Sequence, residues 1–233
     1  MPAAPSPRYV RGAAATRREA PMAESLDLSI VVPTFNESDN IPALLARLER
    51  ALGAGGWEVV FVDDDSPDGT AARVRALARE DRRVRCVQRI GRRGLSSACI
   101  EGMLATAAPF IAVMDADLQH DESVLPAMLA RLRAGEADLV VGSRYAAGGS
   151  TGDWDAGRAR LSRLATRASR LVTRAELSDP MSGFFMLRRE VLEASVRRLS
   201  AIGFKILLDL LASAPRGLRV VEVPYVFRTR SAG

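Results

Sequence analysis

The sequence predicts an α/β protein with a mostly parallel central sheet and helices on both faces. Short runs rich in β-branched residues alternate with segments of helical apolar spacing, and polar loops follow several of these runs. At 233 residues, the chain is long enough for one good-sized core. We expect a single domain over residues 26–233. Residues 1–25 hold Pro, Ala and four arginines without an apolar stretch, and they predict a disordered tail.

The expected elements follow one another along the chain. Five apolar runs predict buried strands, namely Leu28–Val32, Glu58–Asp63, Val84–Gln88, Phe110–Asp115 and Asp138–Gly142. Apolar residues at helical spacing predict helices at 41–52, Thr70–Glu80, Ser96–Ala107 and Ser123–Arg133. Beyond Tyr145 the pattern weakens into a Gly-rich loop, followed by a long helix to about Arg174. A last helical run, Phe204–Ala214, carries Asp209, for which we expect a structural ion pair.

Two carboxylates, Asp115 and Asp117, close the fourth apolar run. Residues two apart on a strand share one face, so the pair concentrates negative charge at the end of a buried strand. That charge is costly unless a cation shares it, and hard divalent ions take oxygen ligands of this kind. Gln119 adds a carbonyl oxygen. The pattern indicates a Mg²⁺ or Mn²⁺ site. The alternative is that Asp117 or Asp121 only caps the next helix.

Three polar loops are expected at one edge of the sheet. They follow the first, second and fourth strands, at 33–37, 63–68 and 115–119, and α/β sheets bind ligands beyond the carboxyl ends of their strands. The middle loop contains three consecutive aspartates, Asp63–Asp65, whose mutual repulsion raises the cost of folding. A carboxylate there can accept hydrogen bonds from the N–H groups of a nucleobase. The sequence therefore predicts one polar crevice.

Composition narrows the function classes. The net charge of +5 comes almost entirely from arginine, since Lys205 is the only lysine, and it favours an anionic partner: nucleotide, phosphate or membrane surface. Glycine-rich dinucleotide and P-loop motifs are absent. His120 is the only histidine, and we expect it to be a loop residue beside the carboxylates rather than a catalytic base. Aromatic-rich stacking motifs are also absent, which argues against nucleic-acid binding.

Four motifs stand in order along the chain: Val-Pro-Thr-Phe-Asn-Glu at 32–37, Asp-Asp-Asp-Ser-Pro-Asp-Gly-Thr at 63–70, Asp-Ala-Asp-Leu-Gln-His at 115–120 and Gly-Ser-Arg-Tyr at 142–145. Together they resemble family 2 inverting glycosyltransferases, most of all the polyprenol-phosphate (dolichol-phosphate) mannosyltransferases. The resemblance spans about Leu28 to Gly233 and implies the GT-A nucleotide-sugar fold. It also implies transfer of mannose from GDP-mannose to a polyprenyl phosphate. Two alternatives stay open: a glucosyltransferase that uses UDP-glucose, and a catalytically inactive nucleotide-sugar binder.

The resemblance also implies roles for individual residues. Contacts with the nucleotide sugar are implied for Pro33, Phe35, Glu37, Val62, Asp64, Asp115, Ala116, Asp117, Gln119, Arg144 and Arg230. The implied metal ligands are Asp117, Gln119 and Asp115. The implied catalytic set is Asp117 with three residues that would hold the acceptor phosphate: Arg144, Arg158 and Ser162. Phe35 stands where the mannosyltransferases often have Tyr. The Asp179–Phe185 loop also resembles a family loop, but we assign it no chemistry.

A lipid-phosphate acceptor accounts for the lack of a clear general base, because a phosphate is already anionic at neutral pH.

In the expected helix from Arg158 to Arg174, one arginine stripe predicts either docking on an anionic membrane or a solvated face. We expect a peripheral protein at the cytoplasmic face of a membrane. Relatives continue beyond Gly233 with Glu-Ser-Lys. The sequence therefore predicts a fragment with weak catalysis, from a longer protein for which a membrane-anchoring C-terminal tail is one expectation.

Overall fold

The computed structural model describes residues 25–150 and 177–228. Its strands are β1 (Leu28–Thr34), β2 (Trp57–Asp63), β3 (Val84–Gln88), β4 (Phe110–Val113), β5 (Leu139–Ser143), β6 (Phe185–Arg188) and β7 (Val220–Pro224). Its α-helices are α1 (Ile41–Leu52), α2 (Thr70–Glu80), α3 (Leu95–Leu104), α4 (Leu125–Arg133), α6 (Arg189–Ser195) and α7 (Ile206–Ser213). Two short 3₁₀ helices, η1 (Glu122–Val124) and η2 (Val196–Arg198), precede α4 and follow α6.

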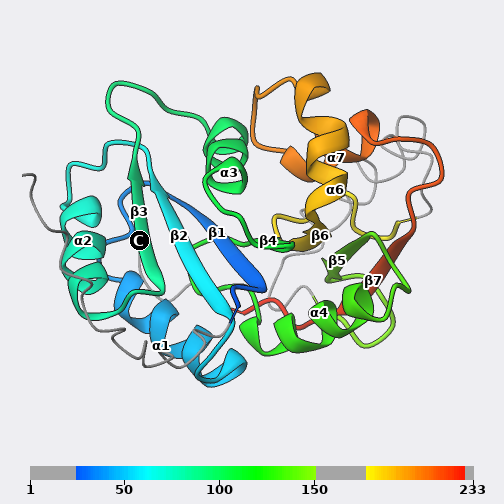
Figure 1. The fold of residues 1–233 in the computed structure, drawn as a ribbon, viewed down its shortest axis with the longest axis horizontal. Helices are drawn as coiled ribbons and strands as arrows, with labels where there is room; N and C mark the ends of the chain where they lie inside the picture. The colour runs from blue at the N-terminus through cyan, green and yellow to red at the C-terminus, as the bar shows by residue number, and fades with distance from the viewer. Residues whose placement is uncertain (1–24, 151–176, 229–233) are drawn as a thin grey trace, which may run out of the picture.

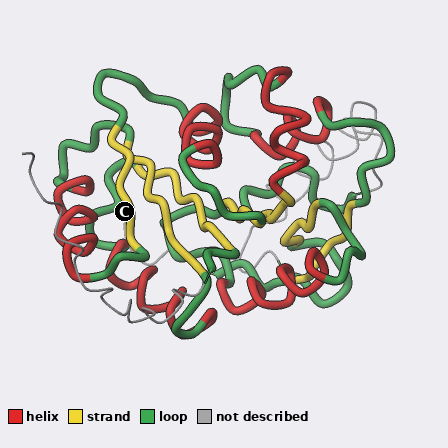
Figure 2. The backbone as a smooth tube through the Cα atoms, in the orientation of Figure 1, coloured by secondary structure: helices red, strands yellow, loops and turns green. Residues whose placement is uncertain are grey.

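The seven strands form one sheet in the order β3-β2-β1-β4-β6-β5-β7, which runs between two layers of helices (Figures 1 and 2). Strand β6 is antiparallel to both of its neighbours, and the other neighbouring strands of the described sheet pair in parallel. The expected mostly parallel sheet with helices on both faces is confirmed. Strands β1, β2 and β4 lie side by side, so the three polar loops that follow them leave the same edge of the sheet.

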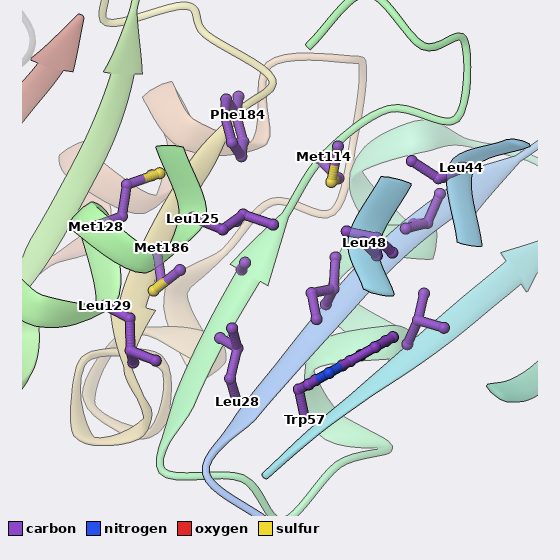
Figure 3. Packing of buried hydrophobic residues seen from close by; sticks show 14 of the residues in the cluster. Leu28, Leu44, Leu48, Trp57, Met114, Leu125, Met128, Leu129, Phe184 and Met186 are labelled. Carbon is purple, nitrogen blue, oxygen red and sulfur yellow. The ribbon is translucent and has the colours of Figure 1, made fainter. Parts of the chain in front are cut away.

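Alternation of side chains along the strands divides the core in two. In β1, Ile30 and Val32 face one cluster and Val31 faces the other, as the period of two requires. Helices α1, α2 and α4 cover the first cluster, where Leu48 of α1 lies on the side of Trp57 and the α4 leucines lie on the side of Met186 (Figure 3). Helices α3, α6 and α7 cover the second. A sheet buried on both faces explains why its strands are nearly continuous apolar runs.

Several sequence-based boundaries were wrong. Strand β4 ends at Val113, so Asp115 and Asp117 lie on the following loop rather than on the strand. The last helix begins at Ile206, not Phe204. Asp209 forms no ion pair within the described residues; its carboxylate accepts hydrogen bonds from the backbone N–H and the hydroxyl of Ser200, both at 2.8 Å. The predicted tail at 1–25 falls almost wholly outside the described residues, as does the predicted helix at 158–174.

Within residues 25–150 and 177–228, no helix combines the length and the apolar character needed to cross a bilayer.

Helix α3 lies against the sheet at a glycine, and this contact yields a stability prediction. A Cβ at Gly102 would stand 2.3 Å from Cγ1 of Val31 and 2.8 Å from Cγ2 of Val62, closer than real contacts allow. We expect Gly102→Ala to lower the free energy of unfolding by about 1–2 kcal/mol, because overpacking outweighs the better helix propensity of alanine. Urea denaturation measures this change.

The double variant Gly102→Ala/Val31→Ala serves as the control. It removes the clashing methyl group, so its loss of stability should be smaller than the sum of the two single losses. If Gly102→Ala alone is as stable as the parent protein, or more stable, α3 can shift away from β1 to make room for the methyl group.

Candidate active site

A cavity of about 240 Å³ opens at the edge where β1, β2 and β4 end. Residues from all three predicted loops line it, together with one residue of α3: Pro33, Thr34, Phe35, Glu37, Asp64, Leu95, Asp115, Ala116 and Asp117. Four of the lining residues are acidic, and none of the described lining residues is basic. The structure therefore brings three separate sequence motifs to one strongly acidic cavity.

The consecutive aspartates at the end of β2 each have their own hydrogen-bond donors. Asp63 is fully buried and accepts hydrogen bonds from the hydroxyls of Ser66 (2.5 Å) and Thr34 (3.3 Å). Asp65 accepts one from the side-chain amide of Gln88 at 3.0 Å. Separate partners offset the repulsion that the sequence predicts between these carboxylates.

Asp64 lines the cavity while both of its carboxylate oxygens are bonded to the loop at 89–94. Arg89 donates from Nη1 to Oδ1 at 2.8 Å, and the Gly94 N–H donates to Oδ2 at 2.7 Å. The Arg89 side chain is only 2% exposed and also donates to the Gly94 carbonyl (3.0 Å) and the Ser97 hydroxyl (2.6 Å). A buried arginine with this many bonds fixes the orientation of the carboxylate that was expected to bind the nucleobase.

The loop after β4 holds its two cavity-lining carboxylates by local hydrogen bonds. Oδ1 of Asp117 accepts a hydrogen bond from the Gln119 backbone N–H at 3.1 Å, which closes a turn around Leu118. Leu118 has a φ of 64°, in the left-handed region that few non-glycine residues adopt. The Asp115 N–H donates to Nδ1 of His120 at 3.2 Å. Strain at Leu118 accompanies the placement of both carboxylates at the cavity.

His120 is buried behind these carboxylates among aromatic rings. Its ring stacks on Phe184 with centroids 5.1 Å apart, and it meets Tyr225 and Phe227 edge-on at 5.8 and 5.9 Å. Burial lowers the pKa of His120 to about 4, so the imidazole is neutral at pH 7. Since Nδ1 accepts the hydrogen bond from Asp115, the ring proton sits on Nε2. His120 therefore supports the loop beside the carboxylates.

The segment after β7 is hydrogen-bonded to the far end of the loop that follows β4, at Gln119. The backbone N–H of Arg228 donates to the Gln119 carbonyl at 2.9 Å, and Nε2 of Gln119 donates to the Arg228 carbonyl at 3.1 Å. The Arg228 guanidinium bonds Glu122 at 2.9 Å and Asp121 at 2.8 Å. Asp121 also accepts a hydrogen bond from the Ser123 N–H and so caps η1, as the capping alternative allowed for this residue.

Arg144 is tied to the loop to which the sequence assigned no chemistry. Its Nε and Nη2 donate to the two oxygens of Asp179 at 2.7 and 2.9 Å, in a bidentate pair. The guanidinium also lies 5.4 Å from the Phe227 ring and 5.6 Å from the Tyr145 ring. Burial lowers the pKa of Arg144, but the hydrogen bonds that Arg144 donates to Asp179 and the negative charge of that carboxylate outweigh burial and hold the pKa above its usual value. Asp179 thus fixes the plane of this guanidinium.

The loop at 179–185 also approaches the cavity carboxylates directly. A Cβ at Gly183 would stand only 3.1 Å from Oδ2 of Asp115, so glycine allows the backbone to pass close to this carboxylate. The hydroxyl of Ser182 donates to the Gly142 carbonyl at 2.7 Å and joins the loop to β5. This loop therefore supports both Arg144 and Asp115.

A divalent cation fits the residues present. The donor set comprises the carboxylates of Asp115 and Asp117 and the amide of Gln119, all oxygen donors of the kind Mg²⁺ and Mn²⁺ bind. The amide nitrogen of Gln119 is bonded to Arg228, and no described residue donates to its Oε1. Within residues 25–150 and 177–228, no cluster of three His, Cys, Asp or Glu side chains is arranged to hold a metal by itself.

The structure separates the predicted site residues into three groups. Seven of them line the cavity: Pro33, Phe35, Glu37, Asp64, Asp115, Ala116 and Asp117. Val62 is fully buried in the core under α3, while Gln119 and Arg144 are not among the cavity-lining residues. The remaining three, Arg158, Ser162 and Arg230, lie outside the described residues.

Sequence reasoning missed four residues of the site. Thr34 and Leu95 line the cavity, and Arg89 and Asp179 hold Asp64 and Arg144 in place. A signal existed for Thr34, which lies inside the first motif. Arg89 is one arginine among many, and its burial is visible only in three dimensions.

The buried pair of Arg89 and Asp64 leads to a prediction about stability and ligand binding. Arg89→Met should leave Asp64 buried without its cation, and we expect a loss of about 3–5 kcal/mol in the free energy of unfolding. The affinity for a nucleoside diphosphate should fall as well, because Asp64 loses its fixed orientation. Urea denaturation and isothermal titration calorimetry at low temperature measure the two effects.

Arg131→Met is the matched control. Arg131 pairs with Glu136 at 2.5 Å, with the two side chains 55% and 49% exposed, so its removal should cost no more than about 1 kcal/mol. Similar losses from the two variants would contradict the assignment of Arg89 as a buried support of the cavity.

Solved structures of low sequence identity share this fold. Glucosyl-3-phosphoglycerate synthase from Mycobacterium tuberculosis, in complex with Mg²⁺ and uridine diphosphate, superposes with a TM-score of 0.64 at 19% identity, over 89% of this chain and 72% of that chain. The same enzyme in complex with Mn²⁺, UDP-glucose and phosphoglyceric acid gives 0.61 at 20% identity, over 88% and 72%. The likeness establishes the GT-A fold.

Curated relatives of higher identity cover most of the chain. A dolichol-phosphate mannosyltransferase from Saccharomyces cerevisiae is 39% identical over 90% of this chain and 80% of its own length. A polyprenol monophosphomannose synthase from Mycolicibacterium smegmatis is 35% identical over 88% and 78%. A dolichol-phosphate mannosyltransferase from Pyrococcus furiosus is 38% identical over 89% of this chain, which spans 58% of that protein's length. The model of glycosyl transferase family 2 matches residues 29–195, and the chain belongs to that family.

Proposed function

We propose that this chain transfers mannose from GDP-mannose to a polyprenyl phosphate of the dolichyl type, with inversion at the anomeric carbon. One observation carries the proposal: a single cavity gathers the three motifs shared with the mannosyltransferases, including seven residues expected to contact the donor. The relatives named dolichol-phosphate mannosyltransferase and polyprenol monophosphomannose synthase support the choice of sugar and acceptor.

The charge of the cavity supports a divalent cation as part of the donor complex. Glu37, Asp64, Asp115 and Asp117 line it, and a nucleoside diphosphate would add further negative charge. Repulsion between these carboxylates and a diphosphate would oppose binding strongly in a partly buried site. Asp117 and Gln119, with Asp115 beside them, would hold Mg²⁺ or Mn²⁺. When bound, the cation would neutralise the diphosphate and act as a Lewis acid toward the leaving group.

The chain's own groups would position the two substrates. Asp64, fixed by Arg89, would accept hydrogen bonds from the N–H groups of the base, and Phe35 would contact the donor at the rim. Arg144, oriented by Asp179, would hold the acceptor phosphate, together with Arg158 and Ser162. Positioning two substrates for in-line attack supplies much of the rate enhancement in reactions of this kind.

The proposed acceptor requires no catalytic base. A phosphate oxygen is already negative at neutral pH, so no proton needs to be removed before it attacks. His120 is the only histidine, and it is buried among aromatic rings with its Nδ1 bonded to the Asp115 N–H. The site is therefore better suited to an anionic nucleophile than to a hydroxyl group. We also propose that the protein acts peripherally at a membrane, where polyprenyl phosphates reside.

The donor can be tested by ligand-dependent thermal stability. GDP-mannose with Mn²⁺ should stabilise the protein more than UDP-glucose with Mn²⁺, because bound ligand stabilises by mass action, by about 2.7 kcal/mol at a hundredfold excess over Kd. GDP and UDP without the sugar show whether the base alone discriminates. A larger shift with UDP-glucose would favour the glucosyltransferase alternative. Stabilisation by GDP-mannose without transfer to polyprenyl phosphate would indicate an inactive binder.

The carboxylate pair can be tested by substitution at Asp117. Asp117→Asn keeps an oxygen that can accept the hydrogen bond from the Gln119 N–H but removes the negative charge. We expect it to retain the melting temperature of the parent while metal-dependent transfer falls at least a hundredfold. Activity is measured with radiolabelled GDP-mannose over a titration of Mn²⁺.

Asp65→Asn is the control for this charge. Asp65 belongs to the same acidic edge but does not line the cavity, so its substitution should leave the Mn²⁺ dependence unchanged. Near-parental turnover of Asp117→Asn at every Mn²⁺ concentration would remove Asp117 from the metal site.

A further inference from the structure

Three large apolar side chains stand out on the surface. Ile90 is 75% exposed, Ile202 is 82% exposed and Phe204 is 72% exposed, the highest values among the large apolar residues that the structure describes. We call these three residues the apolar tip. Single exposed apolar residues are ordinary, but a group of three at such exposure calls for a partner.

The apolar tip comes from two loops that are linked through the first turn of α3. Ile90 lies between β3 and α3, and Ile202 and Phe204 lie between η2 and α7 (Figure 1, upper edge). The backbone N–H of Ser96, in the first turn of α3, donates to the carbonyl of Gly203 at 3.2 Å. This hydrogen bond joins the second loop to the start of α3, directly after the first loop.

Positive charge surrounds the apolar tip. Arg92 and Arg93 follow Ile90 and are exposed, and Lys205 follows Phe204, with its Nζ 5.5 Å from that ring. Two acidic groups lie nearby: Glu101, which Arg92 bonds through both Nη atoms at 2.8 and 3.1 Å, and Asp209, which accepts hydrogen bonds from Ser200 in the second loop. Apolar side chains beside cations with long aliphatic stems match the interface of an anionic bilayer, where the cations lie at the level of the headgroups.

The first of these loops adjoins the cavity through contacts with residues that line it. Arg89, at its start, holds Asp64, and Leu95, just after its end, lines the cavity. Arg93 stacks over the ring of Phe35 at 4.3 Å, and Phe35 also lines the cavity. The loop that carries Ile90 therefore contacts the rim of the cavity through Arg93 and supports its wall through Arg89.

We propose that the apolar tip inserts into an anionic lipid bilayer and sets the rim of the cavity against the membrane surface. This inference rests on the proposed lipid-phosphate acceptor, whose phosphate would have to reach the donor from the headgroup region. Insertion of the tip would present the cavity to that region without lifting the polyprenyl chain out of the membrane. The neighbouring cations would add electrostatic attraction that salt weakens.

Replacing the apolar tip by serine tests the proposal. Ile90→Ser/Ile202→Ser/Phe204→Ser should lower partitioning onto vesicles of phosphatidylcholine with 30% phosphatidylglycerol at least tenfold, measured by sedimentation. Its binding of GDP with Mn²⁺ should match the parent, since none of the three side chains lines the cavity. Transfer to a short, water-soluble prenyl phosphate should also be kept, while transfer to polyprenyl phosphate in vesicles should fall.

Leu104→Ser is the matched control. Leu104 is 55% exposed and lies at the other end of α3, roughly 14 Å along the helix from its start. Its substitution should leave vesicle binding unchanged. A loss equal to that of the triple variant would show that exposed apolar surface in general drives binding, and it would overturn the proposal.

A fluorescent reporter tests insertion directly. Phe204→Trp should show blue-shifted emission on addition of the anionic vesicles and quenching by brominated phosphatidylcholine, after subtraction of the signal from the parent's Trp57 and Trp154. Emission that stays unshifted and unquenched while the protein sediments with vesicles would overturn the proposal, because another face would then contact the lipid.

The remaining outcomes are also decisive. Parental vesicle binding by the triple variant overturns the docking surface. Light scattering that shows the parent as a dimer and the triple variant as a monomer overturns it too, since the tip would then be a contact between copies. Dependence of vesicle binding on the tip, without transfer to polyprenyl phosphate by any variant, supports the docking surface and removes the proposed reaction.

Discussion

The neutralisation of buried acid at the carboxyl edge of the sheet is the constraint on which this molecule depends. Asp63 and Asp64 are buried and Asp115 and Asp117 are half-buried, all within a few residues of strand ends in a sheet that is covered on both faces. Ionised carboxylates cannot be removed from water there unless donors or cations replace the water. The structure supplies these groups individually, with hydroxyls for Asp63, a buried arginine for Asp64 and backbone N–H groups for the loop around Asp117.

The same constraint explains why two arginines of the site face carboxylates in this structure. Arg89 is engaged with Asp64, and Arg144 with Asp179. A bidentate carboxylate on one edge of a guanidinium fixes the plane of the group and the direction of its other edge. Such a pair is weak evidence for stability but sets geometry well, which a phosphate-binding role requires. The loop at 179–185 reads as a simple turn in the sequence, but through Asp179 it orients the Arg144 guanidinium.

The sequence predicts the elements of this fold better than their arrangement. The strands at 28–34, 57–63 and 84–88 follow from apolar runs, and helices α1 and α2 from apolar spacing, because these signals are local. The insertion of antiparallel β6 between β4 and β5 is not local. It depends on which strand edges remain available after the parallel core forms, and no residue of Phe185–Arg188 signals its direction.

The candidate site shows the same division between local and long-range information. Motifs at strand ends predict that Phe35, Asp64 and Asp117 meet, because parallel strands deliver their following loops to one edge. The support of these residues is not predictable in this way. Arg89 lies 25 positions from Asp64, and Arg144 lies 35 positions from Asp179, in a chain where most basic residues are ordinary surface arginines. Only the fold shows which arginines are buried.

The loop at 89–94 links the two halves of the proposed function. Arg89 binds Asp64 on the cavity side and the Gly94 carbonyl at the other end of the loop, so the loop and the carboxylate form one hydrogen-bonded unit. Ile90 follows Arg89 directly and belongs to this hydrogen-bonded loop. A displacement of the loop at a membrane surface would therefore change the position of Asp64 unless the buried ion pair broke, and breaking such a pair is costly. Docking and donor binding would then be thermodynamically linked, and linkage requires that each change the affinity of the other by the same factor.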